Sequence, residues 1–139
     1  MGSVDKVVLS TTDAWVFMAI GPVWKDRLAD VVWSLDYLNR TMPSEAEFEA
    51  SVRRLGAAGF ITVSTKGFKQ IRAGRAVLER FRPLEGVIAI MLELMKEWDG
   101  LAVAAANTEF EFQLKPGEWR RAQEEFEIRL TKRMAKFRK

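Results

Sequence analysis

Residues 53–61, with the sequence RRLGAAGFI, mark the point at which the periodicity of the chain changes. Before this stretch, apolar residues from Phe48 to Leu55 recur at helical spacing, which predicts a helix with one apolar face. After it, the chain is β-branched or aromatic as far as Val63, which favours a strand. Gly59 lies between the two segments, where helices commonly end on a residue in the left-handed region. The stretch therefore predicts a helix that ends at a glycine and leads into a sheet.

A β-hairpin is expected immediately downstream. Residues 65–67 (Thr-Lys-Gly) have the composition of a turn, and residues 68–71 return as a second short strand. Helical character resumes over residues 72–80 and ends before Pro83.

Two further helices are expected upstream. Ser10 can cap a first helix, which should end just before Pro22. Residues 26–39 carry apolar residues at helical spacing and form the second helix. Ser44 and Glu47 form a capping-box pattern, so the third helix should begin directly after Ser44.

The remainder of the chain is expected to be mainly helical. Residues 84–98 form a broad apolar helix, which is explained either by burial against the last helix or by a dimer interface. The first half of residues 101–114 fits a helix or a strand, whereas the apolar–polar alternation of residues 110–114 predicts a strand. Pro116 precedes a final helix, whose apolar side chains predict a docked face with a charged exterior. These side chains are Trp119, Ala122, Phe126, Leu130, Met134 and Phe137.

Helix, helix, tight turn, helix, hairpin and helix, in this order, resemble the winged helix-turn-helix family. The stretch RRLGAAGFI is similar to the family's R-x-L-x-x-x-G-apolar-apolar junction between recognition helix and wing. Residues 68–76 are similar to the second wing strand and the L-T-x-x-G step into the next helix, with Ile71 and Arg72 in place of leucine and threonine. The resemblance implies a mainly α fold with a small β-hairpin wing (α+β). The alternative is a small helical bundle with one hairpin.

The resemblance also implies a division of the chain into two parts. Residues 1–82 would form the winged helix-turn-helix domain. Residues 83–139 would form a C-terminal helical extension that packs on this domain or mediates dimerisation. We therefore expect a homodimer that associates through the C-terminal helices.

A DNA-binding transcriptional regulator is the function that the resemblance implies, with double-stranded DNA as the partner. In such proteins the third helix enters the major groove and the wing rests on the phosphate backbone. Charge supports this role for the wing, since residues 60–82 contain six basic residues and one acidic residue. A solvated hairpin accounts for the same lysines equally well. The residues expected to contact DNA are Arg53, Arg54, Lys66, Lys69, Arg72 and Arg75.

The third helix also has features that oppose DNA binding. Glu45, Glu47 and Glu49 lie in or near its first turn, where they repel phosphates. Small residues such as Ala46 and Ala50 line its outward face and permit close approach of another helix. That helix could be residues 84–98, the last helix or part of a second subunit. The alternative function is thus a winged-helix protein-interaction module without DNA affinity.

Enzymatic activity is not expected. The chain has no cysteine and no histidine, which removes thiolate and imidazole ligands, nucleophilic cysteine and the commonest general base. Its glycines match neither a phosphate-binding loop nor a dinucleotide fingerprint. We therefore predict no catalytic residue, no cofactor and no metal. Its apolar stretches are shorter than a membrane span, so we expect a cytoplasmic protein with no membrane partner.

Overall fold

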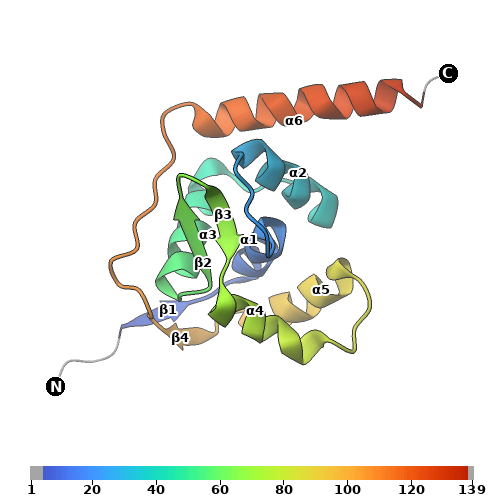
Figure 1. Ribbon diagram of the computed structural model, residues 1–139. Coiled ribbons are helices and arrows are strands. Elements are labelled where there is room, and N and C mark those ends of the chain that lie inside the picture. Colours follow the sequence, from blue (N-terminus) through green and yellow to red (C-terminus); the bar gives the residue numbers. More distant parts are fainter. Residues whose placement is uncertain (1–4, 138–139) are drawn as a thin grey trace.

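The computed structural model describes residues 5–137, which form a mainly α-helical fold with a small antiparallel β-hairpin, as the sequence predicts (Figure 1). The helices are α1 (Thr11–Ile20), α2 (Leu28–Asn39), α3 (Glu45–Ala57), α4 (Arg72–Leu78), α5 (Val87–Trp98) and α6 (Glu118–Ala135), with a 3-10 turn η1 (Glu79–Phe81) after α4. The strands are β1 (Lys6–Val8), β2 (Ile61–Ser64), β3 (Gly67–Gln70) and β4 (Ala102–Ala104). The hairpin pairs β2 with β3, with Ser64 opposite Gly67 next to the turn.

Capping boxes fix the starts of α1 and α3. The Ser44 hydroxyl accepts from the Glu47 N–H at 3.1 Å, and the Ser44 N–H donates to the Glu47 carboxylate at 3.0 Å. This reciprocal pair confirms the predicted start of α3. Hydrogen bonds from the backbone and then the hydroxyl of Ser44 lower the pKa of Glu47, because they favour its ionised form. Ser10 and Asp13 make the same pair of bonds at α1.

The end of α3 is a Schellman motif. The Phe60 N–H donates to the Leu55 carbonyl, and the Gly59 N–H donates to the Gly56 carbonyl, both at 3.0 Å. Gly59 has a φ of 80°, in the left-handed region that favours glycine. The predicted glycine ending of the helix is thus confirmed.

Backbone from the segment between α1 and α2 extends the hairpin by one bridge. Lys25 and Phe68 exchange two backbone hydrogen bonds, at 2.9 and 3.0 Å. Gly67 permits this approach, since a Cβ there would lie 2.0 Å from the Lys25 carbonyl oxygen. The Lys25 ammonium also donates to the Ile20 carbonyl at the end of α1, at 3.0 Å. Burial lowers the pKa of Lys25, and the charge of Asp30 partly opposes this effect.

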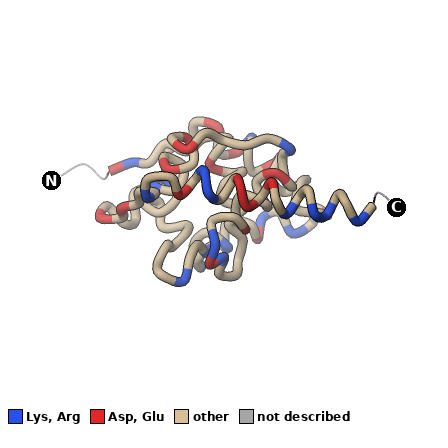
Figure 2. Tube along the Cα trace, turned by 90° about the horizontal axis from the view of Figure 1, so that it is seen from above, with Lys and Arg blue, Asp and Glu red and all other residues tan. Residues whose placement is uncertain are grey.

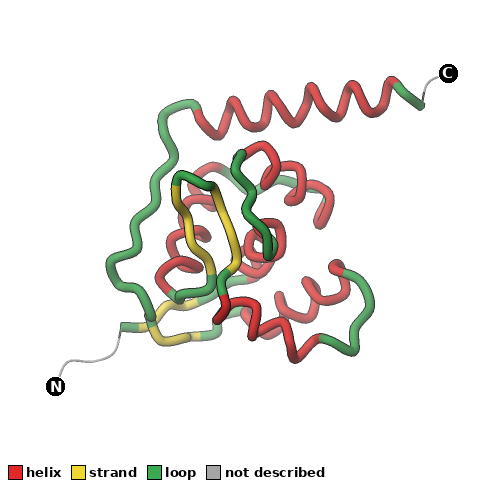
Figure 3. Tube along the Cα trace, in the orientation of Figure 1, coloured by secondary structure: helices red, strands yellow, loops and turns green. Residues whose placement is uncertain are grey.

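The predicted strand over residues 110–114 was wrong. The strand in this part of the chain is β4, which pairs antiparallel with β1, so that Val7 lies opposite Val103. Residues 105–117, which we call the connector, run without regular secondary structure from β4 to α6 (Figure 3). The alternation of residues 110–114 reflects side-chain burial rather than sheet pairing, because Phe110 and Phe112 are half-buried and Leu114 is buried.

One buried cluster connects the predicted segments 1–82 and 83–139. α5 packs on α1, and Trp98 lies within 5.3 Å of the Phe17 ring and 5.4 Å of the Phe60 ring, centroid to centroid. α6 packs along α2, and near its start Trp119 lies 4.8 Å from the Phe48 ring. α5 and α6 thus cover different helices of the core and lie toward opposite ends of the molecule (Figure 1).

Candidate nucleic-acid interface

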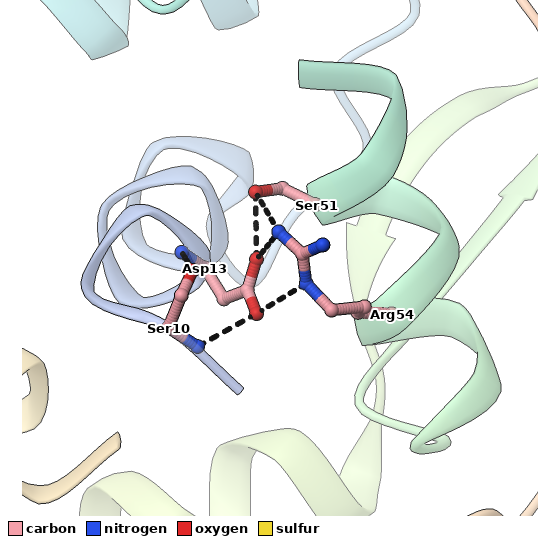
Figure 4. Close-up of polar contacts among 4 residues, drawn as sticks. All are labelled: Ser10, Asp13, Ser51 and Arg54. Carbon is pink, nitrogen blue, oxygen red and sulfur yellow. Dashed lines mark hydrogen bonds and ion pairs between the residues drawn. The ribbon is translucent and has the colours of Figure 1, made fainter. Parts of the chain in front are cut away.

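Arg54, on α3, belongs to a cluster that joins α3 to α1 (Figure 4). Its Nε and Nη2 donate to the two carboxylate oxygens of Asp13, at 2.8 and 2.9 Å. The Ser51 hydroxyl and the Ser10 N–H donate to the same carboxylate, at 2.6 and 2.9 Å. The Asp13 side chain is fully buried, so these four donors replace its hydration.

This cluster commits the Arg54 guanidinium to the protein interior. Its side chain is 34% exposed, but two of its nitrogens are held by Asp13. A DNA contact that drew Arg54 away would leave a buried carboxylate without a countercharge, which is strongly unfavourable. Ser51 and Arg54 lie one helical turn apart and therefore share one side of α3, and the packing of α3 on α1 makes this the inner side.

Arg53 is also engaged within the chain. Its Nε donates to the Phe112 carbonyl at 2.8 Å, and its Nη2 lies 3.6 Å from a Glu49 carboxylate oxygen. Glu49 also contacts the connector directly, since its carboxylate accepts a hydrogen bond from the Leu114 N–H at 3.1 Å. Arg53 and Glu49 therefore hold the connector against α3.

The connector packs on the outward face of α3, which is lined by small residues and which the sequence predicts to be available to DNA or to another helix. The N–H groups of Ala106 and Asn107 both donate to the Ala57 carbonyl, at 2.8 and 2.9 Å. The Phe110 ring lies directly on Gly56, where an added Cβ would come within 2.1 Å of it. The segment that packs on α3 here is therefore the extended connector. It is none of the three helices that the sequence offered as partners for the small residues of α3. At the start of α3, Ala46 remains exposed.

Phe112 anchors the connector between α3 and the hairpin. Its ring meets the rings of Phe48 and Phe68 edge to face, with centroids 6.3 and 5.7 Å away. Such pairs are favourable contacts of aromatic quadrupoles. The connector is therefore part of the packed structure and contacts both α3 and β3.

The other four predicted DNA contacts follow the hairpin and α4. Lys66 is exposed in the turn, and Arg72 and Arg75 are exposed on α4. Lys69 is half-buried, with its ammonium 5.5 Å above the Trp24 ring. Within residues 5–137, none of these four cations forms an ion pair. β3 lies between Lys66 and Arg72, and its four residues alone span about 13 Å at about 3.3 Å per residue, so the four cations form a row and not a cluster.

Two exposed apolar surfaces lie elsewhere on the molecule. The first, which we call the α5 face, consists of Leu84, Val87, Ile88 and Leu92, all exposed. The second, the α2–α6 groove, has a volume of about 360 Å³. It is lined by Trp33, Asp36, Tyr37, Arg40, Phe126, Leu130, Arg133, Met134 and Phe137.

The prediction of a docked apolar face on the last helix is confirmed only for its first half. Trp119 and Ala122 are buried, whereas Met134 is 54% and Phe137 is 79% exposed. α6 has 18 residues and α2 has 12, and the α2–α6 groove separates the C-terminal half of α6 from the C-terminal part of α2. Its position is held near the middle by Arg129, which donates to Asp30 at 2.8 Å, a bond that raises the pKa of Arg129.

In the described part of the chain no membrane-spanning helix indicates a function, and no similar protein does so for the sequence. Among the helices in the described part of the chain, none is long and apolar enough to cross a membrane. Function is therefore inferred from the surfaces above. Comparison of the chain with protein-family models, curated proteins and solved structures finds no match.

Proposed function

We propose that this chain is a cytoplasmic protein-interaction module of winged-helix type that does not read DNA with α3. The observation that carries the proposal is the covered state of α3: the connector packs on its outer face, and both of its predicted DNA-contacting arginines are bonded within the chain. A recognition helix has to present free side chains to base edges in the major groove. The exposed first turn of α3 instead presents Glu45 and Glu47.

Exposed apolar side chains support protein binding as the alternative use of the fold. The α5 face and the α2–α6 groove each bring several large apolar side chains to the surface. Large exposed apolar patches are uncommon on monomeric proteins, and where they occur they often mark interaction sites. Aromatic and methionine side chains, which the groove contains, are also enriched in the cores of protein interfaces.

A titration of mixed double-stranded DNA fragments, followed by fluorescence anisotropy at low and moderate salt, tests this proposal. We expect no sequence-preferring binding, and no effect of Arg53→Ala or Ala46→Glu on whatever affinity is measured. Both positions are exposed, so these variants should stay folded. Sequence-preferring binding that either substitution removes would overturn the proposal, because it would place α3 in the groove.

A DNA-binding transcriptional regulator that uses its wing is the second candidate. It is favoured by the three exposed cations Lys66, Arg72 and Arg75, for which no ion pair occurs within residues 5–137. With Lys69 as a fourth phosphate contact, the logarithm of the affinity should fall with that of salt with a slope of about −3.6, at about −0.9 per contact. Lys66→Ala should then weaken binding and reduce this slope, whereas Arg53→Ala should not.

A further inference from the structure

We infer that two copies of this chain associate head to tail, with the α5 face of one copy seated in the α2–α6 groove of the other. The inference rests on the proposed function, since it names a second copy of the chain as the protein partner. It keeps the self-association that the sequence leads us to expect, but replaces a homodimer with a head-to-tail contact.

The α5 face is apolar at its centre and acidic around it. Its four apolar side chains are between 37% and 50% exposed. Residues 84–99 contain four acidic residues and one basic residue. Two of the four carboxylates are paired, Glu93 with Lys96 at 3.2 Å and Glu97 with Arg80 at 2.5 Å. Glu85 and Asp99 are exposed at the two ends of α5. A partner for this face should therefore be an apolar surface with a basic rim.

The α2–α6 groove has these properties. Tyr37 on one side, and Met134 and Phe137 on the other, expose apolar surface. Residues 128–137 contain four basic residues and no acidic residue, and basic positions recur along this part of α6 (Figure 2). Arg129 is paired with Asp30 and Glu125, and Asp36 also lines the groove, so the net positive charge of the lining comes from Arg40 and Arg133. Arg133 lies at the groove with its guanidinium 5.7 Å from the Trp33 ring.

Arg40 adds a second cation to the groove at a conformational cost. Its φ of 53° makes it the one non-glycine residue with a left-handed backbone among residues 5–137. It ends α2, a position at which glycine would avoid a cost of about 1 kcal/mol. A guanidinium at this place supports a role in contacting a carboxylate partner, since the helix ending itself does not require arginine.

Charge also decides between this arrangement and symmetric ones. A contact between two α5 faces would bring the carboxylates of both copies together, and a contact between two grooves would bring guanidinium and ammonium groups together. Each of these is repulsive, whereas the contact between face and groove is attractive. The two surfaces lie toward opposite ends of the molecule, so one copy can use both (Figure 1). Head-to-tail contacts of this kind extend into longer assemblies or close into rings.

Sedimentation velocity of the full chain and of two single-surface variants tests the inference. Leu92→Glu damages the α5 face and Met134→Glu damages the groove, and both positions are at least half exposed, so the fold should tolerate them. Ala46→Glu, at an exposed position on α3, is the matched control for the added charge. Thermal melts verify that all variants are folded.

We expect the wild type and Ala46→Glu to self-associate with rising concentration between about 5 and about 500 µM, the range of a weak interface. Each single-surface variant should need at least about tenfold more protein, equal to about 1.4 kcal/mol. An equimolar mixture of the two variants should form a heterodimer and nothing larger, because it contains one intact face and one intact groove. High salt should weaken the association.

Three results would overturn the inference. If the wild type associates and one of the two variants alone associates as strongly as the wild type, the contact is symmetric, and only the head-to-tail arrangement fails. If the wild type is monomeric throughout, no second copy occupies the groove, and the DNA titration above decides separately whether the proposed function stands. If a monomeric wild type binds vesicles of phosphatidylserine and phosphatidylcholine, and Met134→Glu abolishes this binding, the groove meets a lipid surface instead.

Discussion

Replacing Arg54 with alanine tests whether this guanidinium serves the core of the protein or its surface. The substitution removes two charge-assisted hydrogen bonds, at 2.8 and 2.9 Å, from a fully buried carboxylate. Asp13 keeps the bonds from Ser10 and Ser51 but loses its countercharge. The folded state then contains a buried anion that the unfolded chain exposes to water.

The expected loss in the free energy of unfolding is about 3 kcal/mol. Breaking a buried ion pair costs about 3–5 kcal/mol, and the lower end applies because the Arg54 side chain is one-third exposed and water can partly replace it. A chain of this size has a total stability of about 5–15 kcal/mol, so the variant should remain folded but be markedly weaker. With a urea m-value of about 2 kcal/mol per molar, the unfolding midpoint should fall by about 1.5 M.

Urea unfolding followed by circular dichroism measures this effect, with Arg53→Ala as the matched control. Arg53 is more exposed and donates to a backbone carbonyl, so its removal should cost about 1 kcal/mol or less. The cycle with Asp13→Ala should show a coupling energy of at least about 1 kcal/mol, as expected for residues in one network. Equal losses for the two arginine variants, or no coupling to Asp13, would refute the assignment of Arg54 to the core.

Three further substitutions test the connector, the α3 cap and the docking of α6. Gly56→Ala should destabilise the chain by about 1–3 kcal/mol and speed amide exchange in residues 105–115, because the new methyl group displaces the Phe110 ring; a gain of about 1 kcal/mol, the ordinary effect of alanine in a helix, would contradict this. Because Ser44 lowers the pKa of Glu47, the stabilisation from Glu47 should be present at neutral pH and lost as the pH falls through its folded-state pKa; Glu47→Gln should flatten the acid limb of a stability profile, and an unchanged profile would count against the cap. Trp119→Ala should cost about 3–5 kcal/mol by emptying the site beside Phe48, whereas the exposed Ile128→Ala should cost less than about 0.5 kcal/mol; similar small losses would show that α6 is not docked.

Local signals in the sequence determined the helices and the hairpin. The start of α3 depends on Ser44 and Glu47, and its end depends on Gly59, and each of these bonds spans only a few residues. The change of period after residues 53–61 likewise placed β2 and β3 correctly. Such elements are predictable because the groups that stabilise them are neighbours in the chain.

Tertiary structure alone decided what the exposed and buried side chains do. The apolar–polar alternation of residues 110–114 indicates only that one side of this segment is buried. Packing on α3 buries that side as well as pairing in a sheet would. Arg54 had the charge expected of a phosphate contact, but its partner Asp13 lies 41 residues away, where no local pattern connects the two. The same holds for Met134 and Phe137, whose helical spacing predicted a core although the α2–α6 groove leaves them exposed. Sequence thus determined which groups are apolar, charged or helical, and the packing of distant segments determined which of them remain free to bind a partner.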